Sequence, residues 1–205
     1  MGNRQTDGWE ALNDNIRTSV GVKDIDNNTN GNGSVPSAVG AYVTATEYGS
    51  GVFHKTVLTV SALPQTILDA SSWASTKIYS FPQGRLWFLT NIMTLAPTTT
   101  TAIATTIKSG VAGAVALGTV ATDSIALTST EVDLCPSTVT ANSTTINVAA
   151  AAVSGFLAAA AFFDGHTTAV DCYLNSSVAA ADIDGNGALT WSGTITLNWV
   201  NCGDY

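Results

Sequence analysis

Residues 189–201, LTWSGTITLNWVN, alternate between two kinds of side chain along their whole length. Successive side chains of a β-strand point to opposite faces of a sheet, so the alternation separates a mostly apolar face from a polar one. The apolar face comprises Leu189, Trp191, Gly193, Ile195, Leu197, Trp199 and Asn201, and the polar face comprises Thr190, Ser192, Thr194, Thr196 and Asn198. This pattern predicts a half-buried antiparallel strand with one face against a core.

Other segments also have the β-branched and aromatic composition of strands. They lie at 51–61, 76–79, 85–95, 114–122 and 130–134, and turn-forming residues follow or separate them at 81–84, 96–97, 135–136 and 164–165. Many short strands separated by turn-forming residues indicate an antiparallel β-sandwich or a jelly-roll-like domain. We therefore predict a mainly β domain over residues 39–205, preceded by an N-terminal arm.

Residues 1–22 have a helical pattern instead. Asp7 can cap a helix, with Glu10 completing a capping box, and four apolar residues then share one helical face. These residues are Trp9, Leu12, Ile16 and Val20. A helix this short is marginal alone, so we predict that its apolar stripe binds a neighbouring subunit or another protein, with folding back on its own domain as the alternative. Residues 23–38 are rich in Asn, Gly and Ser and are expected to form a flexible linker.

The distribution of charge restricts the possible partners. No Lys or Arg follows Lys108, whereas eight carboxylates lie between Asp123 and Asp204. Such a surface lacks the cations that bind phosphates, so neither a nucleic acid nor a membrane is expected as a partner. The remaining surface is rich in Thr and weakly charged, which favours contact with other proteins.

One apolar run requires comparison with a membrane span. Residues 146–163, INVAAAAVSGFLAAAAFF, approach the length of a spanning helix, but polar residues interrupt them and no basic or aromatic anchor flanks them. An Ala-rich helix or a pair of buried strands is the favoured interpretation. The chain opens without an apolar leader, so cytosolic synthesis is expected.

Few side chains have the arrangement that catalysis requires. His54 lies in a strand candidate, and His166 follows Asp164 in a predicted turn without a second histidine nearby. Glu131 and Asp133 share one face of a strand candidate, and paired carboxylates can hydrolyse glycosides. A solvated sheet edge is the favoured explanation of this pair. We therefore expect no catalytic residue and no cofactor.

The most motif-like string is a possible calcium loop. Asp182, Asp184 and Asn186 match the first three alternate ligand positions, but Gly193 stands where the bidentate Glu belongs. Asp and Gly also suit a tight hairpin, so a plain turn is favoured and no metal is expected.

The cysteines give no metal-like spacing. Cys135, Cys172 and Cys202 are expected to be free thiols, with a bridge between Cys172 and Cys202 as the alternative.

Four strings of sequence, taken in order, resemble a known family. They are GAYVTATEYGSGVFHKTVLT at 40–59, KIYSFPQG at 77–84, FFDGHTTAVDCYLN at 162–175 and GTITLNWVNCGDY at 193–205. Together they resemble the small virion proteins of tailed bacteriophages that are described as capsid decoration or head proteins. The resemblance implies a β-rich structural protein on the capsid exterior that binds the major capsid protein, and it implies no catalytic residues.

These observations lead us to expect a phage structural protein that decorates or cements the capsid. A homotrimer is expected, because capsid lattices offer threefold positions that a small closed oligomer fits. The alternatives are a carbohydrate-binding module of a head or tail fibre, a coat protein, and an enzyme such as a polysaccharide depolymerase.

Overall fold

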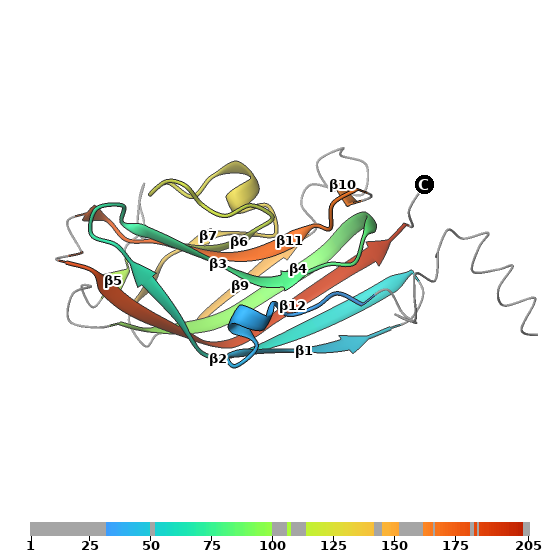
Figure 1. Ribbon diagram of the computed structural model, residues 1–205, viewed down its shortest axis with the longest axis horizontal. Helices are drawn as coiled ribbons and strands as arrows, with labels where there is room; N and C mark the ends of the chain where they lie inside the picture. Colours follow the sequence, from blue (N-terminus) through green and yellow to red (C-terminus); the bar gives the residue numbers. More distant parts are fainter. Residues whose placement is uncertain are drawn as a thin grey trace, which may run out of the picture.

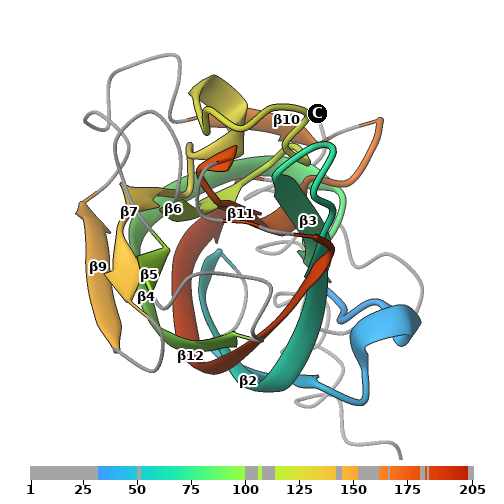
Figure 2. The same ribbon diagram turned by 90° about the vertical axis from the view of Figure 1, so that its left-hand side faces the viewer.

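The computed structural model describes residues 32–49, 52–99, 106–107, 114–141, 145–151, 162–165, 167–180, 183 and 185–202. Two antiparallel sheets, of six and four strands, pack face to face as a sandwich (Figure 1). Seen end-on in Figure 2, both sheets curve around a shared core. The described residues contain two short 3-10 segments and no α-helix. The predicted mainly β sandwich is confirmed.

The larger sheet has the order β1-β2-β12-β4-β10, and β9 also pairs with β4. Its strands are β1 (Val43–Tyr48), β2 (Phe53–Ile67), β12 (Gly187–Asn201), β4 (Gly84–Thr99), β9 (Ile146–Ala151) and β10 (Phe162–Gly165). Because β9 pairs with residues 90–95 of β4 and β10 pairs with residues 84–87, both strands lie along one edge of β4.

The smaller sheet has the order β3-β11-β6-β7. Its strands are β3 (Trp73–Ser80), β11 (Asp171–Ser177), β6 (Ala114–Gly118) and β7 (Cys135–Thr138). A separate ladder joins β5 (Thr106–Ile107) to β8 (Thr140–Ala141), and the 3-10 segments are η1 (Ser37–Val39) and η2 (Ser129–Glu131).

Strand β12 lies between β2 and β4, and its inward face is the one that the alternation predicts. Trp191, Ile195 and Trp199 on this face are fully buried, as are Leu189 and Leu197. Threonines 190, 194 and 196 point the other way and are exposed or half-buried. The pairing register shifts at Trp191/Gly193 and at Leu197/Trp199. Such bulges bend and twist a strand, which helps β12 to follow the curved sheet.

The turn predicted at residues 96–97 is wrong, since Pro97 lies inside β4 opposite Trp191. Proline cannot donate a ladder hydrogen bond and is tolerated where one side of a strand has no neighbour. The pairing of β4 with β9 ends at Leu95, so among the described strands β4 has no neighbour on that side at Pro97. Pro64 in β2 has the same explanation, because pairing with β1 ends at Val60.

The strand predicted at 130–134 is also wrong. Residues 129–131 form η2, bends follow, and β7 begins at Cys135. The cause is local hydrogen bonding: Thr128 and Glu131 form a reciprocal capping box, which satisfies backbone amides that a strand would have offered to a neighbour. Similarly, the strand predicted at 114–122 ends at Gly118.

A polar side chain joins the two sheets inside the core. Gln65 of β2 donates from Nε2 to the Thr76 hydroxyl at 3.0 Å and to the Leu174 carbonyl at 2.9 Å. Its Oε1 accepts the Ser176 hydroxyl at 2.6 Å and the Trp191 indole at 2.8 Å. All four hydrogen-bonding positions of the amide are therefore used, and a fully satisfied network of this kind specifies one packing of the sheets.

The described fold begins at Asn32, before the expected start of the domain at residue 39. Ser34 pairs with Ser80 through a β-bridge, and Val39 of η1 joins the hydrophobic core. Gly33 makes this approach possible, because a Cβ atom there would lie 2.5 Å from the Tyr79 ring. The rest of the predicted linker, residues 23–31, and the arm lie outside the described residues.

The two ends of the Ala-rich run form β9 and β10. These are edge strands, whereas the sequence favoured a helix or two buried strands, and residues 152–161 lie outside the described part. Within the described residues, the structure has no helix with the length and apolar character that crossing a bilayer requires.

Candidate interaction surface

The residues predicted from the sequence to bind a partner are not among those described. Trp9, Leu12, Ile16 and Val20 all fall within residues 1–31, so their role stays a prediction. His166 also lies outside the described residues.

The possible calcium loop is described only in part. Asp182 and Asp184 lie outside the described residues, whereas Asn186 is exposed and its Oδ1 accepts the backbone N–H of Asp69 at 3.0 Å. The segment joins β11 of one sheet to β12 of the other, so it does not form a tight hairpin. Among the described residues, no group of three or more His, Cys, Asp or Glu side chains could hold a metal ion.

The described histidine belongs to the core. His54 of β2 is 5% exposed, and its ring stacks on the Trp199 indole with centroids 4.0 Å apart. The Trp199 indole donates to the Thr56 hydroxyl at 2.9 Å, and Thr56 donates to a Glu47 carboxylate oxygen at 2.8 Å. Tyr79 donates to the other Glu47 oxygen. Burial and this carboxylate together raise the pKa of Tyr79.

The carboxylates of Glu131 and Asp133 do not form a solvated edge, so that interpretation is wrong. Glu131 is 8% exposed and accepts the backbone N–H groups of Asp123 at 3.1 Å and Thr128 at 2.8 Å. Asp133 accepts the Thr119 amide at 2.8 Å and its hydroxyl at 2.6 Å. Burial raises the pKa of Asp133 to about 6. Both carboxylates hold the connection between β6 and β7.

The cysteines are free thiols, so the alternative of a bridge between Cys172 and Cys202 is wrong. Cys135 and Cys172 are buried in the core, and Cys202 is half-buried. Burial raises the pKa of Cys172, and the nearby thiol of Cys135 raises it further. Cys135 and Cys172 act as small apolar core residues.

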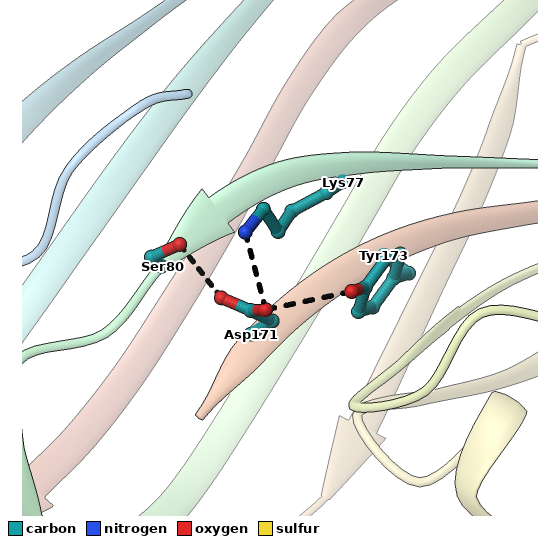
Figure 3. Close-up of polar contacts among 4 residues, drawn as sticks. All are labelled: Lys77, Ser80, Asp171 and Tyr173. Atoms are coloured by element: carbon teal, nitrogen blue, oxygen red, sulfur yellow. Dashed lines mark hydrogen bonds and ion pairs between the residues drawn. The ribbon is translucent and has the colours of Figure 1, made fainter. Parts of the chain in front are cut away.

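A polar cluster lies where β3 ends and β11 begins (Figure 3). Asp171 accepts the Ser80 hydroxyl at 2.6 Å, lies 3.3 Å from the Lys77 ammonium and accepts the Tyr173 hydroxyl at 3.4 Å. Partial burial and this carboxylate raise the pKa of Tyr173. The contacts join two paired strands, so we assign the cluster a structural role.

One outer face of the sandwich is covered by its own chain. The connection between β6 and β7, with η2, lies over the smaller sheet (Figure 1). Asn175 of β11 donates to the carbonyls of Val120 and Glu131 at 2.9 Å each, and it accepts the Thr122 amide at 3.1 Å. A Cβ atom on Gly118 would lie 2.3 Å from the Glu131 backbone, so this connection packs directly on β6.

The other outer face, on the larger sheet, is open and rich in hydroxyl groups. The register aligns its outward residues in rows that cross the strands. One row is Thr44, Thr59, Thr194, Thr94 and Asn147, and the next is Thr46, Val57, Thr196 and Ile92. All of these side chains are exposed or half-buried, and none is charged. We call these two rows the threonine face.

A third row ends the threonine face with larger side chains. Tyr48 pairs with Lys55, which pairs with Asn198, and Phe53 lies one outward position further along β2. Tyr48 is 54% exposed and Phe53 is 67% exposed, the highest value among the large described hydrophobic residues. The Lys55 ammonium lies 5.6 Å from the centre of the Tyr48 ring. We call Tyr48, Phe53 and Lys55 the aromatic end.

Sequence reasoning did not find the aromatic end. Phe53 is aromatic within a predicted strand, which suggests a core residue, yet His54 points inward and Phe53 outward. The available signal is Lys55, because residues two apart on a strand share a face and a lysine is rarely buried.

Comparisons with protein-family models, with curated proteins and with solved structures found no match for this chain.

Proposed function

We propose that this chain is a structural protein of a tailed-phage virion that decorates or cements the capsid exterior by binding the major capsid protein. The threonine face is the observation that carries the proposal. It is broad, open and free of charge, and its hydroxyl and methyl groups can meet another protein without burying an unpaired ion. The family resemblance of residues 40–205 supports the same assignment.

The mechanism would be mechanical. A decorating protein adds contact area across the seams between coat subunits, and internal pressure must then overcome this additional interaction energy. The sandwich suits such a load, because the Gln65 network joins its two sheets through buried hydrogen bonds. A homotrimer at a threefold position would place three copies of the threonine face on neighbouring subunits. The protein would be made in the host cytoplasm and join the virion there.

The test uses capsids of the encoding phage assembled without this chain. The purified protein should sediment with these capsids, and electron cryomicroscopy should then show its density on the outer surface of the shell. Absence of binding under conditions in which both components are folded would contradict the proposal. Failure of the shell to assemble without the chain would favour a coat protein instead.

The aromatic end favours a carbohydrate-binding module as the second candidate. Exposed rings can stack on sugars, and Tyr48 and Phe53 are exposed on one sheet face. Trp191 and Trp199, which could have supplied larger platforms, are buried in the core. Binding to a glycan array together with no affinity for capsids would support this candidate over decoration.

A further inference from the structure

We propose that the aromatic end is the anchor of the capsid contact, with Phe53 entering an apolar pocket of a coat subunit and Lys55 facing a carboxylate beside that pocket. This inference rests on the proposed function and names the surface that performs it. It also specifies the chemistry that the partner must present.

The asymmetry of the sandwich selects the face. The smaller sheet carries its own cover, since Asn175 holds the connection between β6 and β7 against it. On the larger sheet, by contrast, Thr44, Thr59 and Thr194 are exposed in one row. A partner can therefore approach the larger sheet without displacing a described segment.

The area of this face shows that both of its parts are needed for a contact. Strands lie about 4.8 Å apart, and outward residues of one strand lie about 6.6 Å apart, so the three rows together with Phe53 cover roughly 400 Å². One partner of a typical specific interface contributes about 800 Å². The threonine face and the aromatic end together therefore supply about half of that area, whereas the aromatic end alone supplies much less.

Within this area, Phe53 has the properties of an anchor. Its ring is 67% exposed, and its register neighbours are Val200 on β12, which is 6% exposed, and Trp87 on β4, which is half-buried. Tyr48 lies diagonally across the β1–β2 ladder, within reach of aromatic side chains. Aromatic residues that become buried in a pocket of the partner supply much of the binding energy of many interfaces.

The charge at this end indicates the partner's chemistry. Of the described cations, Lys77 and Arg85 form ion pairs with Asp171 and Asp164, whereas Lys55 pairs with no described carboxylate. The ammonium instead lies over the Tyr48 ring. A carboxylate on the partner would complement this charge, and a basic partner surface would be repelled.

The experiment measures the affinity of variants for capsids assembled without this chain. Phe53→Ala and Lys55→Glu should each weaken binding about tenfold or more. Lys55→Arg should restore most of the affinity because it keeps the charge. Val120→Ala, at a residue 47% exposed in the connection over the smaller sheet, is the matched control and should bind like wild type. All of these side chains are exposed, so the melting temperatures should stay within a few degrees of wild type.

A second pair of variants tests the threonine face. Thr59→Arg puts a charge in the first row of this face and should abolish binding, whereas Thr130→Arg puts the same charge in the connection over the smaller sheet and should not.

If wild type binds the capsids and Phe53→Ala, Lys55→Glu and Thr59→Arg bind with the same affinity, this inference is wrong. The proposed function would still stand in that case. No binding by wild type would overturn the proposed function itself. If glycan binding is then found and Phe53→Ala removes it, the aromatic end is a carbohydrate site and not a protein anchor.

Discussion

The imidazole of His54 and the indole of Trp199 lie parallel in the core, with ring centroids 4.0 Å apart and planes 5° apart. The two residues occupy neighbouring strands, β2 and β12, and face each other directly in the register. Phe81 packs on the same indole edge-to-face, with centroids 5.5 Å apart. Trp199 therefore connects the larger sheet to the aromatic part of the core, and its removal is a sensitive test of the fold.

Trp199→Ala should lower the free energy of unfolding by about 3–5 kcal/mol, because it removes a buried aromatic side chain. Asn198→Ala is the control. Asn198 points outward, and its side chain donates one hydrogen bond to the Thr90 carbonyl at 2.6 Å, so its loss should cost about 1 kcal/mol. Denaturant unfolding measures both values. Equal losses would mean that the faces of β12 are assigned incorrectly.

Gln65→Met should destabilise the protein by roughly 2–4 kcal/mol although the side-chain volume is kept. The substitution leaves the buried Trp191 indole N–H and Ser176 hydroxyl without their acceptor. Gln83→Met is the matched control at an exposed position and should change stability by less than about 0.5 kcal/mol. If thermal unfolding responds equally to both substitutions, the network does not stabilise the sandwich.

Gly193→Ala should cost about 3 kcal/mol or more. Gly193 has a φ of +143°, and a Cβ atom there would lie 2.1 Å from the Thr94 carbonyl oxygen. Gly40→Ala has no such conflict, since the nearest atom would be 3.6 Å away, and it should be nearly neutral. The melting temperatures of the two variants measure this difference in stability. A Gly193→Ala protein as stable as wild type would contradict the backbone geometry of the bulge at Gly193.

Asp133 should make stability depend on pH. Burial raises its pKa to about 6 in the folded protein from the ordinary 3.8. Between these values the folded state binds a proton that the unfolded state has released. The contribution of Asp133 to stability is therefore largest below the lower value and decreases as pH rises through about 6.

Asp133→Asn should remove this contribution. The difference in unfolding free energy between wild type and variant, followed from about pH 4 to pH 7, isolates it from the other carboxylates. Wild type should lose stability relative to the variant as pH rises. A difference that is constant with pH would contradict the raised pKa.

Deletion of residues 1–22 tests the arm predicted from the sequence. The apolar stripe of Trp9, Leu12, Ile16 and Val20 should contribute to capsid retention without stabilising the sandwich, because a tethered second contact raises the effective concentration of the first. Retention on capsids should therefore fall while the melting temperature stays unchanged. Undiminished retention would show that the arm is not an anchor.

Local patterns in the sequence were sufficient to predict strand β12 and the fold class. Alternation is a property of consecutive residues, so Trp191 and Trp199 could be assigned to a core before any partner strand was known. The threonine-rich, weakly charged surface was equally predictable, because it follows from composition and from the same alternation.

Contacts between residues far apart in the sequence decided which other side chains are buried and which are exposed. Gln65 meets Ser176, which lies 111 positions away, and no local pattern indicates that this polar residue belongs in the core. Glu131 is buried because the connection that contains it folds onto β6, where Gly118 leaves room for its backbone. Phe53 is exposed because the register of β2 against β12 points His54 inward. The pairing of strands selects which of two alternating faces meets the core, and that selection depends on the whole sandwich.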